Sequence, residues 1–313
     1  MSGTSASCQC RRSLLTPIAA ALLCACGNSN YLAAPGLAAS LSANRSIDLS
    51  EATGPLSLDT PDAAARAAIG ASLFYRSVID VLGSESDGKS YAKSTTTEDC
   101  SGGGTRTTDK SGLDRTVRYS QCLEGSRFTD GLFKVEVTSP GYPNSGATAT
   151  LGENDIPILA ESRDPADDFR TLALGTLVGD VRVDSHGDVK EVNANANMKG
   201  AEEDLDGTPR MNYGLDDVRV DVHIDGSDLL INESGNFRLT GDCGVGQASV
   251  GTNRDVRINK DTGVVSDGQL QLSNASAQSA SVTFNADQSV DVAVVDGAAQ
   301  HYTLEQYRAL CPF

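Results

Sequence analysis

The segment from Asp217 to Asp225 constrains the fold of this chain more than any other stretch. Every second residue in it is apolar and β-branched: Val218, Val220, Val222 and Ile224. The residues between them are Asp, Arg or His. This period of two predicts a β-strand with one buried face and one solvated face. Shorter forms of the pattern begin at Asp180, Asp255 and Asp291, so we expect many such strands side by side.

Turn residues recur at short intervals between the alternating segments. Examples are Asp225-Gly226, Glu233-Ser234-Gly235, Asp267-Gly268 and Asp296-Gly297. Because closely spaced turns join neighbouring antiparallel strands, we predict a meander from Lys89 onward. The expected fold class is mainly β, with one large antiparallel meander that is strongly curved or closes partly into a half-barrel.

Two helices are expected at the ends of this sheet. Thr60-Pro61-Asp62 combines a capping hydroxyl, a proline at the first helical position and an acid in the first turn. Apolar residues then recur at helical spacing up to Leu82, before Gly83. We predict that the sheet packs on this N-terminal helix, 61–82. A capping-box pattern at Thr303 predicts a short C-terminal helix that ends near Leu310.

The composition restricts the class of partner. The 313 residues carry a formal net charge of −17. A surface of this sign repels nucleic acids and anionic headgroups, so we expect neither as a partner. The length is sufficient for one large domain with a sizeable core.

The first residues have the features of an export signal. Arg11 and Arg12 precede a short apolar run, 13–23. This arrangement is typical of a secretion signal and is too short to span a bilayer permanently. The run ends in Leu23-Cys24-Ala25-Cys26, which resembles the lipobox of bacterial lipoproteins. The resemblance implies that Cys26 receives diacylglycerol.

Two alternatives to lipidation at Cys26 exist. Cys24 is a competing acceptor, but bulky Leu23 then occupies the −1 position, where the lipobox has a small residue. The other alternative is an ordinary cleaved signal with incidental cysteines. In bacterial lipoproteins a residue other than Asp after the lipidated Cys implies passage to the outer membrane, and Gly27 fits. We therefore expect a lipid anchor, including palmitate, in the outer membrane, facing the periplasm or the cell surface.

These observations divide the chain into three parts. Residues 1–25 are the expected lipoprotein signal peptide. Residues 26–58 are rich in Ser, Ala, Asn and Gly without a sustained period, which predicts a flexible tether. Residues 59–313 are the expected single antiparallel β domain.

Downstream of Cys26 the chain has four cysteines: Cys100, Cys122, Cys243 and Cys311. An even number in an exported chain predicts two disulfides, with three connectivities. Cys100 and Cys122 flank a predicted hairpin, 105–111 with 114–121, so they should lie close together. That leaves Cys243 with Cys311, which ties the final helix to the sheet. Zinc is the alternative, but there is no Cys-x-x-Cys and the three histidines are scattered.

The cysteine pattern also carries a family resemblance. The segments Cys100–Thr105, Tyr119–Cys122 and Gly131–Val135, and the run Cys243-Gly244-Val245-Gly246, are similar to those of uncharacterised proteobacterial β-rich outer-membrane lipoproteins with a Cys-linked β-hairpin. The resemblance covers about half of the chain and implies no activity. The expected architecture is also similar to that of the half-barrel carriers of lipids and lipoproteins in the envelope, which curve a sheet around helices.

Two short motifs resemble functional sites, an aspartic-protease triplet and a calcium loop, but the surrounding sequence lacks the other residues that each site needs. Asp261-Thr262-Gly263 matches the triplet of aspartic proteases, but no second triplet supplies the paired carboxylate, so a hairpin turn is favoured. Glu202, Asp204 and Asp206 have the spacing of a calcium loop, but Tyr213 stands where a bidentate Glu is needed. We retain these three acids as candidates and favour a solvated acidic loop.

The expected function follows from location and fold class. The sequence has no Gly-x-Ser-x-Gly, P-loop or His-Glu-x-x-His motif, and we predict no cofactor. We expect a non-enzymatic binding or structural role at the outer membrane, with an envelope protein or an apolar ligand as partner. The alternative is a periplasmic carrier or assembly factor that holds an apolar ligand between helix and sheet. A hydrolase comes third.

Overall fold

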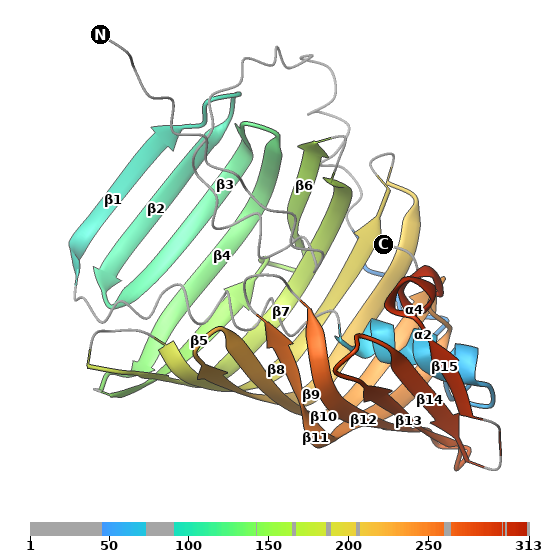
Figure 1. Cartoon of the computed structure of the whole chain (residues 1–313). Coiled ribbons are helices and arrows are strands. Elements are labelled where there is room, and N and C mark those ends of the chain that lie inside the picture. Colours follow the sequence, from blue (N-terminus) through green and yellow to red (C-terminus); the bar gives the residue numbers. More distant parts are fainter. Residues whose placement is uncertain are drawn as a thin grey trace, which may run out of the picture.

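The computed structural model describes residues 46–72, 91–141, 143–164, 167–185, 189–204, 207–259, 264–295, 297 and 299–311. In these residues the chain forms one antiparallel sheet of 15 strands and two short helices (Figure 1). The predicted fold class, a single large antiparallel meander, is confirmed. Neither described helix has the length and apolar character that crossing a bilayer requires.

The elements follow one another in chain order. The N-terminal half of the sheet contains β1 (Tyr91–Asp99), β2 (Thr105–Gly112), β3 (Asp114–Glu124), β4 (Arg127–Ser139), β5 (Asn144–Leu151), β6 (Ile158–Asp164), β7 (Asp167–Val183) and β8 (Val189–Glu203). The C-terminal half contains β9 (Pro209–Asp225), β10 (Asp228–Gly241), β11 (Gly246–Asn259), β12 (Val265–Ser273), β13 (Ser279–Phe284), β14 (Val290–Val294) and β15 (Ala299–Tyr302). The helices are α2 (Pro61–Ser72) and α4 (Leu304–Ala309).

Almost every strand pairs with its neighbours in sequence, as a meander requires. The exception lies between β4 and β7, where both β5 and β6 are inserted. β5 and β6 run in the same direction along the same pair of neighbours, so they are two halves of one strand position. Residues 152–157 interrupt it with a small hairpin, in which Glu153 and Ile156 exchange backbone hydrogen bonds of 2.9 Å.

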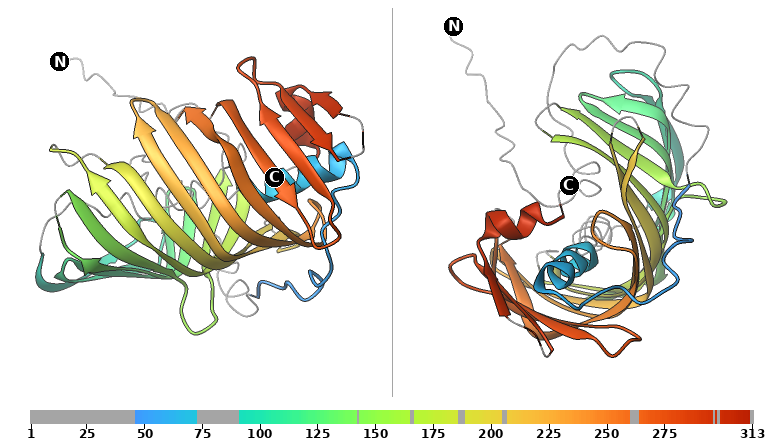
Figure 2. Two further views of the ribbon diagram at one scale, coloured as in Figure 1. Left: turned by 90° about the horizontal axis from the view of Figure 1, so that it is seen from below. Right: turned by 90° about the vertical axis from the view of Figure 1, so that its right-hand side faces the viewer.

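The sheet curls strongly, so that its C-terminal part bends around the helices (Figure 2). We call the concave side, which carries the residues of the larger core cluster, the inner face, and the other side the outer face. α2 contributes five alanines to that cluster: Ala64, Ala65, Ala67, Ala68 and Ala71. Its main contacts are with β10, β12, β13 and β14. At its first turn, the Tyr302 hydroxyl donates a hydrogen bond of 2.6 Å to Asp62.

The expected first helix, 61–82, is described only as far as Ser72. Its remaining part lies outside the described residues. The Thr60 hydroxyl accepts a hydrogen bond of 3.2 Å from the backbone N–H of Ala63, which is the expected N-cap. α4 begins with the predicted capping box, in which Thr303 and Gln306 each bond the other's backbone N–H.

The strand that dominated the sequence pattern is longer than its alternation showed. Val218, Val220 and Val222 of β9 are buried on the inner face, while Arg219 and His223 are exposed. Upstream of Asp217 the buried residues are odd-numbered instead of even-numbered: Met211, Tyr213 and Leu215. A bulge at Asp217, whose φ is 53°, shifts the phase by one residue, so both halves keep their apolar side chains on one face.

A similar bulge replaces a predicted turn. Glu233-Ser234-Gly235 was expected to connect two strands, yet it lies inside β10. The pairing of β10 with β11 shifts between Ile231 and Ser234, and Gly235 has a φ of 151°. A Cβ at Gly235 would lie 2.6 Å from the Cα of Val218, so this glycine permits the close approach of β9.

The segment before α2 is the last part of the expected tether, 26–58, of which residues 46–58 are described. These residues are packed against the sheet. Ile47 contacts a small apolar cluster on the outer face, whereas Leu56 and Leu58 belong to the inner core with exposures of 2% and 1%. The segment therefore crosses from one face to the other, and the folded domain includes residues that the sequence assigned to the tether.

Candidate functional site: the inner face and its buried carboxylates

The inner face carries one continuous apolar layer from Val117 on β3 to Val294 on β14. The strand register aligns a row of its residues directly across five strands: Val135, Ala149, Leu177, Ala196 and Val218. All five are buried. The layer is therefore wider than the part of the sheet that α2 mainly contacts, which begins at β10.

Small side chains dominate the middle of this layer. β5 and β8 present alternating alanines to it: Ala147, Ala149, Ala194 and Ala196. On these strands the intervening residues are Thr or Asn and lie on the outer face. Short side chains let neighbouring strands curve toward the apolar side without crowding, which agrees with the strong curl of the sheet (Figure 2).

Glu233 breaks the apolar character of the inner face. It stands directly opposite Val220 and two residues after Ile231 on the same face. Its side chain is 1% exposed, and neither carboxylate oxygen has a hydrogen-bond partner among the described residues. Its backbone N–H donates to the Thr252 hydroxyl at 2.9 Å. Burial raises the pKa of Glu233 well above its usual value, because a buried site disfavours the charged form of the carboxyl.

Glu202 is a second buried acid on the inner face, at the end of β8. The Thr171 hydroxyl donates a hydrogen bond of 2.8 Å to it. Burial raises the pKa of Glu202 to about 8, and the Thr171 bond and the charge of Arg210 oppose that rise. The ring of Tyr213 lies over Gly200, where an added Cβ would be 2.2 Å from the ring carbon Cζ. Burial, and secondarily the charge of Glu202, raises the pKa of Tyr213.

The outer face has its own buried charges at the same end of the sheet. The register places Glu161, Arg170 and Glu203 in one row across β6, β7 and β8. Arg170 Nε lies 3.1 Å from Glu203 Oε2. Burial raises the pKa of Glu203, and the charge of Arg170 opposes the rise. A small apolar cluster flanks the row: Leu123, Phe128, Leu159, Leu172 and Ala201, with Ile47.

The calcium candidates do not converge. Glu202 points into the inner core, whereas Asp204 is partly exposed and pairs with Arg210. Asp206 lies outside the described residues, as does the 261–263 triplet. Within the described residues one group of metal-ligand type occurs, Cys100, Cys122 and Glu124. Its two sulfurs are joined in a disulfide, so they are not available as thiolate ligands.

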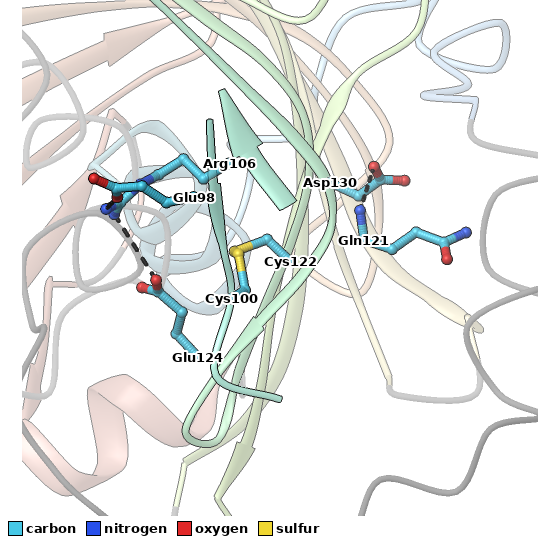
Figure 3. The surroundings of a disulfide bond; sticks show 7 residues. All are labelled: Glu98, Cys100, Arg106, Gln121, Cys122, Glu124 and Asp130. Carbon is cyan, nitrogen blue, oxygen red and sulfur yellow. Dashed lines mark hydrogen bonds and ion pairs between the residues drawn. A yellow bond between two sulfur atoms is a disulfide. The ribbon is translucent and has the colours of Figure 1, made fainter. Parts of the chain in front are cut away.

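The described residues contain two disulfides, and these join the pairs that the sequence suggested. Cys100–Cys122 has a Cα–Cα distance of 5.4 Å and closes the turn between β1 and β2 onto β3. Cys243–Cys311, with a Cα–Cα distance of 5.2 Å, ties the second residue after α4 to the turn between β10 and β11. Beside the first bridge, Arg106 pairs with Glu98 and lies 3.9 Å from Glu124 (Figure 3).

The expected lipidation residue, Cys26, lies outside the described residues. The sequence interpretation also missed Glu233 and the Glu161–Arg170–Glu203 row. A signal for Glu233 was present, because it is in phase with Ile231 on an alternating strand. The turn-like composition of Glu-Ser-Gly hid that signal. The charged row had no comparable signal, since it is assembled from three strands.

Comparisons of the chain with protein-family models, with curated proteins and with solved structures find no match.

Proposed function

We propose that this chain is an exported, lipid-anchored protein of the outer membrane that acts by binding rather than by catalysis. The observation that carries the proposal is the inner face, a continuous buried apolar layer on a curved sheet from β3 to β14. Curved sheets with one apolar side enclose apolar partners without needing reactive groups. The lipobox-like Cys26 supports the anchor, and the two disulfides support an oxidising compartment.

A carrier of apolar molecules is the second candidate. A specific observation favours it: the apolar layer continues over β3 to β9, beyond the strands that α2 mainly contacts. The carried molecule would lie against alanines and valines of β5 and β8 and would be recognised by its apolar surface. A structural or protein-binding role would not require this face to admit a small molecule.

Titration with a fluorescent fatty acid separates these roles. The carrier predicts saturable binding that Ala149→Phe blocks, because Ala149 is fully buried in the inner layer. Thr148→Phe is the matched control, since Thr148 is the preceding residue on the outer side of β5. Saturable binding lost only in the inner variant supports the carrier. Absence of binding by the native chain rejects the carrier and leaves the structural or protein-binding role.

A further inference from the structure

The two edges of the sheet are unequal. β15 has four residues and leads directly into α4, which packs beside it. β1 has nine residues, and its side chains from 92 to 99 are exposed on both faces. Among the described strands only β2 pairs with β1, so its other edge presents unpaired backbone groups (Figure 1). A long exposed edge of this kind is a template for adding another strand.

β1 is well suited to accept such a strand. Its centre is the β-branched run Thr95-Thr96-Thr97, and it contains no proline. Its pairing with β2 is regular from Ser94 to Asp99, and the shift in register is confined to residues 91–94. The opposite side of the strand is held in place, because Thr95 donates to Asp109 at 2.5 Å and Glu98 pairs with Arg106 (Figure 3).

The charges of β1 identify the partner. Lys93 and Asp99 lie near the two ends of the strand, and neither has an ion-pair partner among the described residues. Two antiparallel strands alternate between hydrogen-bonded and non-hydrogen-bonded pairs. A two-fold axis midway between two residues would map a hydrogen-bonded pair onto a non-hydrogen-bonded pair, so such an axis is excluded. The axis between identical strands therefore has to pass through a residue that faces its own copy.

Only one of the central positions makes the charges complementary. With the axis at Thr96, Ser94 faces Glu98 of the other copy, and Lys93, the residue before the regular part of β1, comes beside its Asp99. With the axis at Thr95 or Thr97, both Lys93 and Asp99 face uncharged residues. We propose that β1 pairs antiparallel with β1 of a second copy, with Thr96 on the two-fold axis, which joins two sheets into one.

The dimer is expected to be weak. One added strand pair buries less surface than a standard interface of about 1,600 Å², so we expect dimerisation that depends on protein concentration. The proposal does not depend on any ligand at the inner face, because β1 lies at the far end of the sheet from α2 (Figure 1).

Charge exchange tests both the partner and the register. Lys93→Asp places two acids opposite each other at each end of the dimer, and Asp99→Lys places two lysines there. Each variant of the full chain should dimerise at least about tenfold more weakly than the native chain in sedimentation experiments. An equimolar mixture of the two should dimerise like the native chain, because every acid of one then faces a lysine of the other.

A cysteine at the axis provides an independent readout. Thr96→Cys should give a disulfide-linked dimer on mild oxidation, because position 96 faces itself. Thr107→Cys is the control, since Thr107 lies on β2, paired with Thr97 and away from the edge. A native chain that stays monomeric at about 100 µM, a mixture that fails to recover dimerisation, or equal cross-linking at 96 and 107 would each overturn the proposal.

Discussion

At the scale of single residues, the most consequential group is the carboxyl of Glu233. It lies opposite Val220, is almost fully buried, and has no hydrogen-bond partner among the described residues. A buried carboxyl without a partner destabilises the fold even when it is neutral, and it destabilises the fold far more when it is charged. Burial raises its pKa in the folded chain, whereas the unfolded chain has the ordinary value near 4.3.

The sign of the resulting pH dependence follows from proton binding. Above the ordinary pKa the unfolded chain releases the proton of Glu233 while the folded chain retains it. Raising the pH therefore favours unfolding until the folded chain also releases the proton. Below pH 4 both states bind the proton, and this group adds no pH dependence.

Glu233→Gln removes the titrating group and keeps the shape of the side chain. We expect the variant to melt at a higher temperature than the native chain at pH 7–8, with a difference that shrinks toward pH 5. Glu305→Gln, at an exposed position on α4, is the control and should not change the pH profile. Identical pH profiles of the melting temperature for Glu233→Gln and the native chain would contradict the argument.

At the scale of elements, β9 tests the assignment of the two faces. Val220→Ala removes two buried methyl groups and should lower the free energy of unfolding by about 1–3 kcal/mol. Arg219 is exposed and pairs with Asp221 on its own strand at 2.9 Å. Arg219→Ala should therefore cost at most about 1 kcal/mol. Urea denaturation measures both, and equal losses would mean that β9 is buried on both sides.

Much of β9 could be predicted because the alternation of 217–225 is local in sequence. The bulge at Asp217 was not predictable, since it reverses the phase of the buried residues upstream, and a pattern of fixed period cannot follow that change. At Glu233-Ser234-Gly235 the sequence predicts a turn, but the structure has a bulge within β10. Residues typical of turns also form bulges within strands, so their composition does not distinguish the two.

The two disulfides give an ordered prediction at this scale. Cys243 and Cys311 are separated by 68 residues, whereas Cys100 and Cys122 are separated by 22. Chain-entropy estimates give about 4 kcal/mol for the longer loop and about 3 kcal/mol for the shorter. Replacing Cys243 and Cys311 with alanines should therefore lower the denaturant midpoint more than replacing Cys100 and Cys122. The reverse order would show that loop length does not govern their contributions.

At the scale of the whole molecule, the antiparallel sheet and the order of its strands were predictable, but the buried row of charged residues on the outer face was not. A meander needs only local turns and alternation, both of which are visible in a sequence. The row Glu161–Arg170–Glu203 takes one residue from each of three consecutive strands, β6, β7 and β8, so its burial depends on the register of all three at once. Residues 46–58 have a linker-like composition, although Leu56 and Leu58 are core residues, so composition alone does not reveal their burial.

The proposed lipid anchor would decide where the whole molecule acts, and Cys26 is its expected attachment site. Cys26→Ser should abolish incorporation of labelled palmitate and release the chain from the membrane fraction, because an acylated cysteine contributes about 0.8 kcal/mol of membrane affinity for each buried CH₂ group. Cys24→Ser is the matched control, since Cys24 lies two residues away and precedes the expected cleavage position. It should retain both label and membrane association. Palmitate that persists in Cys26→Ser and disappears in Cys24→Ser would move the anchor to Cys24, and its persistence in both variants would remove the lipobox as the basis for an outer-membrane location.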